Sequence, residues 1–152
     1  MSRLSNVNDP VREEYVASIL AKEAGLQFHI TPQNFVFDFM LYDEKDYRVL
    51  GEIKIRERFF PDWFIADKKI NWLEKANKTF RCVPWFVIHC IENGIIYRLN
   101  LHENYEFTED SMTNPYSTGI QTETGRKVPV QYWKTIETRS SFNGGMSSID
   151  WK

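Results

Sequence analysis

Residues 37–57, FDFMLYDEKDYRVLGEIKIRE, place charged residues inside two apolar, strand-like runs. Side chains alternate along a strand, so Asp38 lies on the same face as Met40, a face that the pattern favours for burial. Glu52 and Lys54 share a face of the second run in the same way. A lone buried carboxylate is costly unless it is neutralised. We therefore expect a shared proton, a basic group or a metal ion beside Asp38.

The segments on either side of this stretch predict a regular order of helices and strands. Pro10 at a first helical position and Gly25 at a stop bound a first helix. The tetrapeptide DEKD is the expected turn between the two strands, and Asn93-Gly94 is the favoured two-residue turn of a later hairpin. The expected elements, in chain order, are a helix over about 10–24, strands over 28–30, 34–42 and 47–56, a second helix over 61–79, a hairpin over 83–101 and a late strand over about 128–136. This order predicts an α/β or α+β fold with a central mixed sheet flanked by helices.

Length and composition predict one packed domain. The chain has 152 residues, of which 42% are hydrophobic and 15% aromatic, enough for a sizeable core. We expect a single domain over 1–152, with its core at about 10–101 and a flexible tail at 138–152. The apolar runs are too short to span a membrane and the N-terminus does not resemble a signal peptide, which predicts a cytoplasmic protein. Cys82 and Cys90 are expected to be buried free thiols.

Charge is distributed unevenly along the chain. The formal net charge of −2 at pH 7 disfavours a tight, non-specific binder of nucleic acid. Residues 52–81 nevertheless contain eight basic and five acidic residues, whereas residues 1–46 contain eight acidic and four basic ones. This polarity fits one positive surface beside an acidic pocket, and equally two solvated faces.

Pairing of the two strands around DEKD would bring Asp38 and Glu52 together. An oxygen-rich pocket of Asp, Glu, a main-chain carbonyl and water suits Mg²⁺ or Mn²⁺. Lys54 beside such an ion could hold or activate a water and stabilise charge on a phosphate. Glu13 lies at the border of the apolar face of the first helix and could add a carboxylate, whereas Glu14 points away from that face.

Glu13 on an early helix, Asp38 at the end of an apolar strand and Glu52-Ile53-Lys54 in the following strand form a pattern that resembles the PD-(D/E)XK nuclease superfamily. This superfamily includes restriction endonucleases and Holliday-junction resolvases. The resemblance covers residues 10–100 and extends to the order helix, three strands, helix, strand (αβββαβ). Phe37 stands where many members have proline.

The resemblance implies a role for each matched residue. Asp38, Glu52 and the main-chain carbonyl of Ile53 would bind Mg²⁺ or Mn²⁺, Lys54 would position or activate the attacking water, and Glu13 would be an accessory acid. Residues that would hold the nucleic-acid backbone are Arg56, Arg58, Lys69 and, as a second choice to Lys69 on the second helix, Lys68. The implied activity is metal-dependent hydrolysis of DNA by a structure-specific endonuclease of phage or mobile-element type, acting as a homodimer or in a larger nucleic-acid-processing complex.

Two alternatives stay open. Glu52 and Lys54 could form an ordinary exposed strand face, and the chain could be an inactive nuclease-fold protein that binds nucleic acid or another protein. Among the aromatic residues that follow the second strand, Phe59, Phe60 and Trp63 are the best candidates to stack on bases, with core packing as the other interpretation.

Overall fold

The computed structural model describes residues 10–32, 35–114 and 121–138. None of the helices in this part of the chain combines the length and the apolar character needed to cross a membrane. The elements are α1 (Pro10–Ala24), β1 (Gln27–Ile30), β2 (Phe39–Tyr42), β3 (Tyr47–Arg56), β4 (Asp62–Ala66), α2 (Asp67–Phe80), β5 (Val83–Cys90), β6 (Ile95–Asn100), β7 (Thr108–Asn114), β8 (Gln121–Pro129), the short 3-10 helix η2 (Val130–Tyr132) and β9 (Lys134–Glu137).

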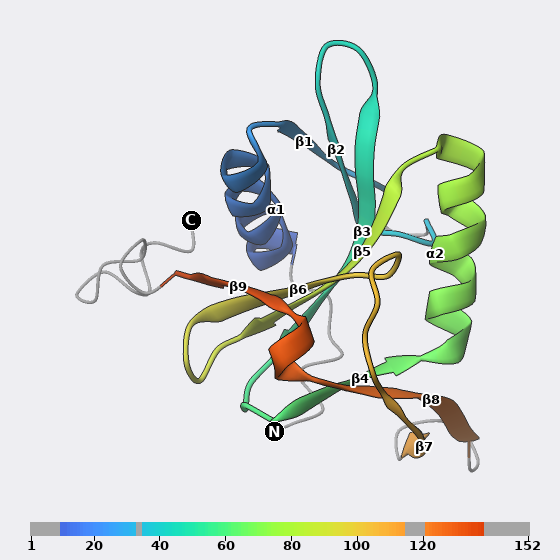
Figure 1. The fold of residues 1–152 in the computed structure, drawn as a ribbon. Helices are drawn as coiled ribbons and strands as arrows, with labels where there is room; N and C mark the ends of the chain where they lie inside the picture. Colours follow the sequence, from blue (N-terminus) through green and yellow to red (C-terminus); the bar gives the residue numbers. More distant parts are fainter. Residues whose placement is uncertain (1–9, 33–34, 115–120, 139–152) are drawn as a thin grey trace.

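Among the described residues, six strands form a central sheet in the order β1-β2-β3-β5-β6-β9. Strands β3 and β5 run parallel, and α2 lies on the path that connects them, whereas the other neighbouring pairs of this sheet are antiparallel. The sheet is therefore mixed, as the sequence predicts. Figure 1 shows α1 and α2 on opposite sides of it.

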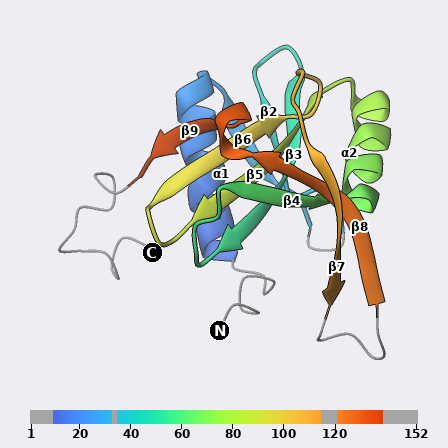
Figure 2. The same ribbon diagram turned by 60° about the horizontal axis from the view of Figure 1, so that its bottom comes forward.

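Each face of the central sheet has its own hydrophobic core. On one face, α1 buries Val16 and Leu20 against Phe39, Ile53 and other apolar residues of the sheet. On the other face, α2 packs together with a second sheet, which within the described residues has three antiparallel strands in the order β4-β8-β7. Figure 2 shows this second sheet beside α2. Leu50 belongs to the α2-side core, and by strand alternation Glu52 and Lys54 share its face.

The structure corrects four details of the expected elements. The strand expected over 34–42 begins only at Phe39, so Asp38 directly precedes β2 instead of lying within it. The segment expected to be one helix from residue 61 is a strand, β4, followed by a helix that begins at Asp67. The β5–β6 turn spans residues 91–94 rather than two, and Gly94 has φ +69°. The late strand is divided into the end of β8, η2 and β9.

The second sheet takes in residues for which the sequence predicted no regular element. The expected tail lies outside the described residues apart from Thr138, which is buried and donates its N–H to the carbonyl of Gly94 at 2.9 Å. Cys82 and Cys90 are buried free thiols, as expected.

Candidate active site

Asp38 is held against the backbone of β3 at the point where β2 begins. Its N–H donates to the carbonyl of Gly51 at 2.7 Å, and its carboxylate Oδ2 accepts the N–H of Ile53 at 2.8 Å. The antiparallel register pairs Phe39 with Gly51, so Asp38 comes opposite Glu52. The hairpin around DEKD thus brings together the two acids that the sequence singled out.

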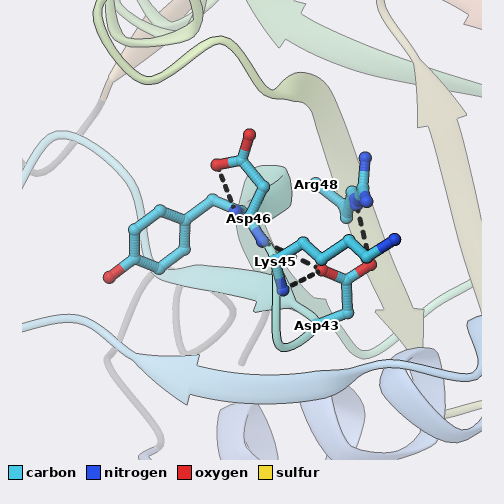
Figure 3. A network of polar contacts seen from close by, with 5 residues as sticks. Asp43, Lys45, Asp46 and Arg48 are labelled. Carbon is cyan, nitrogen blue, oxygen red and sulfur yellow. Dashed lines mark hydrogen bonds and ion pairs between the residues drawn. The ribbon is translucent and has the colours of Figure 1, made fainter.

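The hairpin turn is itself tightly bonded, and a one-residue register shift separates it from the site. Tyr42 pairs with Tyr47, whereas Leu41 pairs with Val49, and only after this shift does Asp38 come opposite Glu52. Asp43 Oδ1 accepts the N–H groups of Lys45 and Asp46, both at 2.9 Å, and its Oδ2 accepts Arg48 Nε at 2.9 Å (Figure 3). Such an Asx-type turn closes two strands without a glycine. A one-residue slip would move Glu52 to the opposite face of the sheet.

Glu52 is a buried carboxylate with two lysine partners. Its side chain is almost fully covered, and the residue is 4% exposed. One oxygen, Oε2, lies 3.3 Å from Lys54 Nζ and 3.1 Å from Lys69 Nζ. Lys54 comes from the same strand, two residues on, and Lys69 comes from the first turn of α2. Both lysines neutralise a charge that would otherwise be costly to bury.

The negative charge of the Asp38 carboxylate is disfavoured by its surroundings. Burial and, next, the negative charge of Glu52 raise its pKa from 3.8 to about 6, although the Ile53 N–H, Lys54 and Lys69 act in the opposite direction. Two ionised carboxylates at close range favour a cation beside them. Two carboxylates and the carbonyl of Ile53, brought together by the pairing of β2 and β3, are oxygen ligands of the kind that a hard divalent ion prefers.

Glu13 lies on α1, whose buried residues pack on the face of the sheet opposite to Glu52. Within the described ranges, no group of three or more acidic, histidine or cysteine side chains is arranged to hold a metal ion. Asp38 and Glu52 are therefore placed as a pair, and Glu13 does not join them in such a group. The helical period predicts that Glu13 borders the apolar face of α1, but it cannot predict on which side of the sheet that face packs.

The basic residues predicted to hold nucleic acid take different positions. Arg56 is half-buried at the end of β3; burial lowers its pKa, and the charge of Glu52 opposes that effect. Arg58 is exposed in the loop that follows. On α2, Lys69 contacts Glu52, whereas Lys68 turns to the second sheet and pairs with Glu123 Oε2 at 2.8 Å.

The second sheet, which the sequence did not reveal, anchors the start of α2. Besides the Lys68–Glu123 pair, Thr124 Oγ1 donates to Asp67 Oδ2 at 3.0 Å. Both contacts tie the first turn of α2 to β8. The two α2 residues that make them, Asp67 and Lys68, directly precede Lys69, so the contacts help to fix the helix turn that carries it.

Gly51 keeps the site strands close together. A Cβ atom at this position would lie 2.5 Å from the carbonyl oxygen of Trp85 and 2.7 Å from the Phe39 ring. No ordinary side chain fits such a space. The glycine thus lets β3 approach β5 and lets Phe39 cover the strand beside Glu52.

No protein-family model matches the chain, and no curated protein sequence matches it significantly. Among solved structures, the chain is similar to Hjc, a Holliday junction resolvase from the archaeal hyperthermophile Archaeoglobus fulgidus, with 12% sequence identity and a TM-score of 0.50. The similarity covers 81% of this chain and 94% of that one. It agrees with the resemblance read from the residues. The chain has the restriction endonuclease-like fold of the PD-(D/E)XK nucleases.

Proposed function

We propose that this protein is a Mg²⁺- or Mn²⁺-dependent nuclease that hydrolyses DNA phosphodiester bonds. The observation that carries the proposal is the juxtaposition of Asp38 and Glu52 on paired strands, with Lys54 and Lys69 on one oxygen of Glu52. Two acids and two lysines at a buried position are hard to explain by stability alone, because apolar residues would stabilise a core at least as well.

Asp38, Glu52 and the Ile53 carbonyl are the groups that would hold the metal. A bound divalent ion polarises the scissile phosphate and lowers the pKa of a bound water. Asp38 would be ionised for this role at neutral and mildly alkaline pH, because its pKa is about 6. We therefore expect the activity at limiting Mg²⁺ to rise with pH around pH 6, because a proton competes with the ion for Asp38.

Lys54 and Lys69 supply positive charge at the same place. Once a cation shares Glu52, either ammonium group can turn to an attacking water or to the phosphate oxygens. Lys54 is proposed to orient the water and Lys69 to stabilise negative charge on the phosphate. Arg56 and Arg58 are proposed to contact the flanking backbone, which positions DNA without reading its sequence. Glu13 stays a proposed accessory acid.

The substrate class is also a proposal. The similar solved structure is that of a Holliday junction resolvase, which supports a branched or otherwise distorted DNA as substrate. A homodimer or a larger complex would supply the second cut and the positive surface that a chain of net charge −2 lacks. We also propose a role in the processing of phage or mobile-element DNA inside the cell. The basis for this role is the small size of the domain.

The direct test is a cleavage panel of linear and circular duplex, single strand, flap and four-way junction. Each substrate is incubated with Mg²⁺, with Mn²⁺ or with EDTA. Lys54→Ala should abolish metal-dependent cleavage, whereas Lys75→Ala, which removes an exposed lysine of α2, should cleave like the unmodified protein. Equal cleavage by both variants would exclude the proposed site.

A binding protein without catalysis is the second candidate. It is favoured by the ion pairs of Glu52, since the two lysines already neutralise this acid without any metal. That function predicts DNA or protein binding that is independent of divalent ions, with intact substrates in every reaction of the panel. It also predicts that Mn²⁺ leaves the melting temperature unchanged.

A further inference from the structure

Two phenylalanines are exposed in the loop between β3 and β4. Phe59 is 41% exposed and Phe60 is 52% exposed, whereas Trp63, the third aromatic candidate, is 3% exposed and belongs to the core. Large apolar side chains that stay in water beside a charged site often mark a binding surface. Core packing thus accounts for Trp63 and leaves the two phenylalanines without an explanation.

The buried Trp63 contacts both exposed rings. Its ring centroid lies 6.3 Å from that of Phe59 and 6.0 Å from that of Phe60, with interplanar angles of 88° and 81°. Edge-to-face contacts of this kind are favourable. Because the Trp63 ring stands nearly perpendicular to both, it does not stack flat on either phenylalanine.

The loop that carries these rings is fixed by hydrogen bonds. The N–H of Phe59 donates to Glu92 Oε1 at 2.8 Å, and the N–H of Ile91 donates to the carbonyl of Arg56 at 2.8 Å. The loop is thus bound to the β5–β6 turn beside it. A rigid aromatic surface loses little conformational entropy when a ligand binds.

The register of the central sheet places this surface near Lys54. Lys54 pairs with Ile88, and Ile88 pairs with Tyr97, so Lys54 and Tyr97 lie in one row, two strand spacings or about 10 Å apart. Residues in such a row share a face of the sheet. The Phe59 ring centroid is 6.3 Å from that of Tyr97. The rings therefore lie on the side of the sheet that carries the candidate active site.

We propose that Phe59 and Phe60 form a platform on which unpaired bases of the DNA substrate stack. The inference rests on the proposed nuclease function and narrows its substrate to DNA with unstacked nucleotides beside the cut. Base stacking on aromatic rings is sequence-tolerant and is paired with basic groups that hold the backbone. Arg56 ends β3 and Arg58 lies in the loop that carries the platform, so two basic groups proposed to hold the DNA backbone are adjacent to it in the sequence.

The spacing along the chain sets the reach of this platform. Phe59 follows Lys54 by five positions in the chain, and a fully extended chain of that length spans at most about 18 Å. A stacked strand advances about 3.4 Å per nucleotide. The bases on the platform would thus lie within roughly five nucleotides of the scissile phosphate, so that the protein would cut close to a flap, a bubble or a branch point.

The test separates binding from cleavage. Binding of a fluorescein-labelled 15-nucleotide single strand and of the matching blunt duplex is measured by anisotropy in EDTA, where metal-dependent cleavage cannot occur. Stacking on an aromatic side chain contributes about 1–3 kcal/mol per base, which corresponds to roughly 5- to 150-fold in affinity. Phe60→Ala should therefore weaken binding of the single strand at least about 5-fold and leave duplex binding within about 2-fold. Phe60→Trp should restore it, and Phe60→Leu should not.

Phe80→Ala is the matched control. Phe80 is 37% exposed and makes an edge-to-face contact with the buried Phe37, at 5.7 Å and 82°, but it lies at the far end of α2 from Lys69. Its replacement should not change single-strand binding. Equal losses in Phe80→Ala and Phe60→Ala would show a general effect of lost aromatic surface and would overturn the platform.

The remaining outcomes distinguish the platform from the nuclease. Phenylalanine-dependent binding of the single strand without any cleavage would support the platform and count against the nuclease. Cleavage of every substrate with unchanged preference in Phe60→Ala would support the nuclease and overturn the platform. Conversion of a dimer to a monomer by Phe60→Ala in sedimentation experiments would make this patch a subunit interface and would also overturn the proposal.

Discussion

Replacing Asp38 by Asn should make the protein more stable at pH 8 while abolishing its activity. Asn keeps an oxygen that can accept the N–H of Ile53, but it removes the negative charge that burial and Glu52 disfavour. A residue selected for metal binding rather than stability should show this combination. A residue that serves the core should show the reverse.

The magnitude follows from the raised pKa of Asp38. A pKa raised from 3.8 to about 6 corresponds to roughly 3 kcal/mol, at about 1.4 kcal/mol per unit. The folded protein binds this proton more tightly than the unfolded chain, so the contribution of Asp38 to stability is retained below pH 4 and is lost as the pH rises from 4 to 6. Asp38→Asn should thus raise the free energy of unfolding by about 1–3 kcal/mol at pH 8 and by much less at pH 4.

The assay is urea unfolding of both proteins at pH 4 and pH 8, with and without Mn²⁺. For a chain of this size, 1 kcal/mol shifts the melting temperature by about 2–4 °C, so thermal melting is a second readout. Saturating Mn²⁺ should stabilise the unmodified protein by mass action and leave Asp38→Asn unchanged. An Asp38→Asn protein that is less stable than the unmodified one at pH 8 would refute the electrostatic reasoning.

Three further predictions concern the neighbourhood of the site. Lys69→Met should reduce cleavage at least about 100-fold, and it should destabilise the fold because the buried carboxylate of Glu52 loses one of its two partners. Lys68→Met removes an exposed ion pair and should change the free energy of unfolding by no more than about 1 kcal/mol. Cleavage rates and urea unfolding of both variants measure these effects. Gly51→Ala should destabilise by about 1–3 kcal/mol, because its Cβ would lie 2.5 Å from the carbonyl of Trp85, and equal unfolding midpoints would contradict this. Burial and, next, a neighbouring arginine lower the pKa of His89 to about 4. The contribution of neutral His89 to stability is therefore present above pH 6.5 and is lost as the pH falls to 4. In urea unfolding at a series of pH values, His89→Leu should reduce the loss of stability between pH 6.5 and pH 4.

The charged residues in apolar strands and the local signals around them were sufficient to predict the fold class and the order of most central elements. The sequence placed Asp38 and Glu52 on neighbouring strands because a short hairpin turn and strand alternation are local signals. It did not predict the one-residue register shift between Leu41 and Tyr42 that brings the two acids opposite each other. The order of the first helix, three strands, second helix and hairpin followed from equally local signals. The mixed sheet confirms that order, with β4 inserted before the second helix.

The second sheet could not be predicted, for a physical reason. Trp63 and Ile65 alternate as a strand does, but the apolar residues that follow have helical spacing, so the two patterns merge into one amphipathic segment. Strand β7, with the sequence TEDSMTN, lies at an edge of its sheet and lacks the alternating apolar residues by which a strand is predicted. The resemblance already placed Lys69 before Lys68, and the structure shows their different partners, since Lys69 contacts Glu52 whereas Lys68 pairs with Glu123 of the second sheet.

The measurement that tests the central claim most directly is the rate of cleavage of a four-way junction and a flap as a function of Mg²⁺ concentration, for the unmodified protein and Glu52→Gln. Gln has nearly the same shape as Glu but lacks the charge that would hold the ion. The account predicts a rate that rises to saturation with Mg²⁺ in the unmodified protein and no cleavage by Glu52→Gln at any concentration. Cleavage by Glu52→Gln at the unmodified rate, or cleavage by either protein in EDTA, would contradict it.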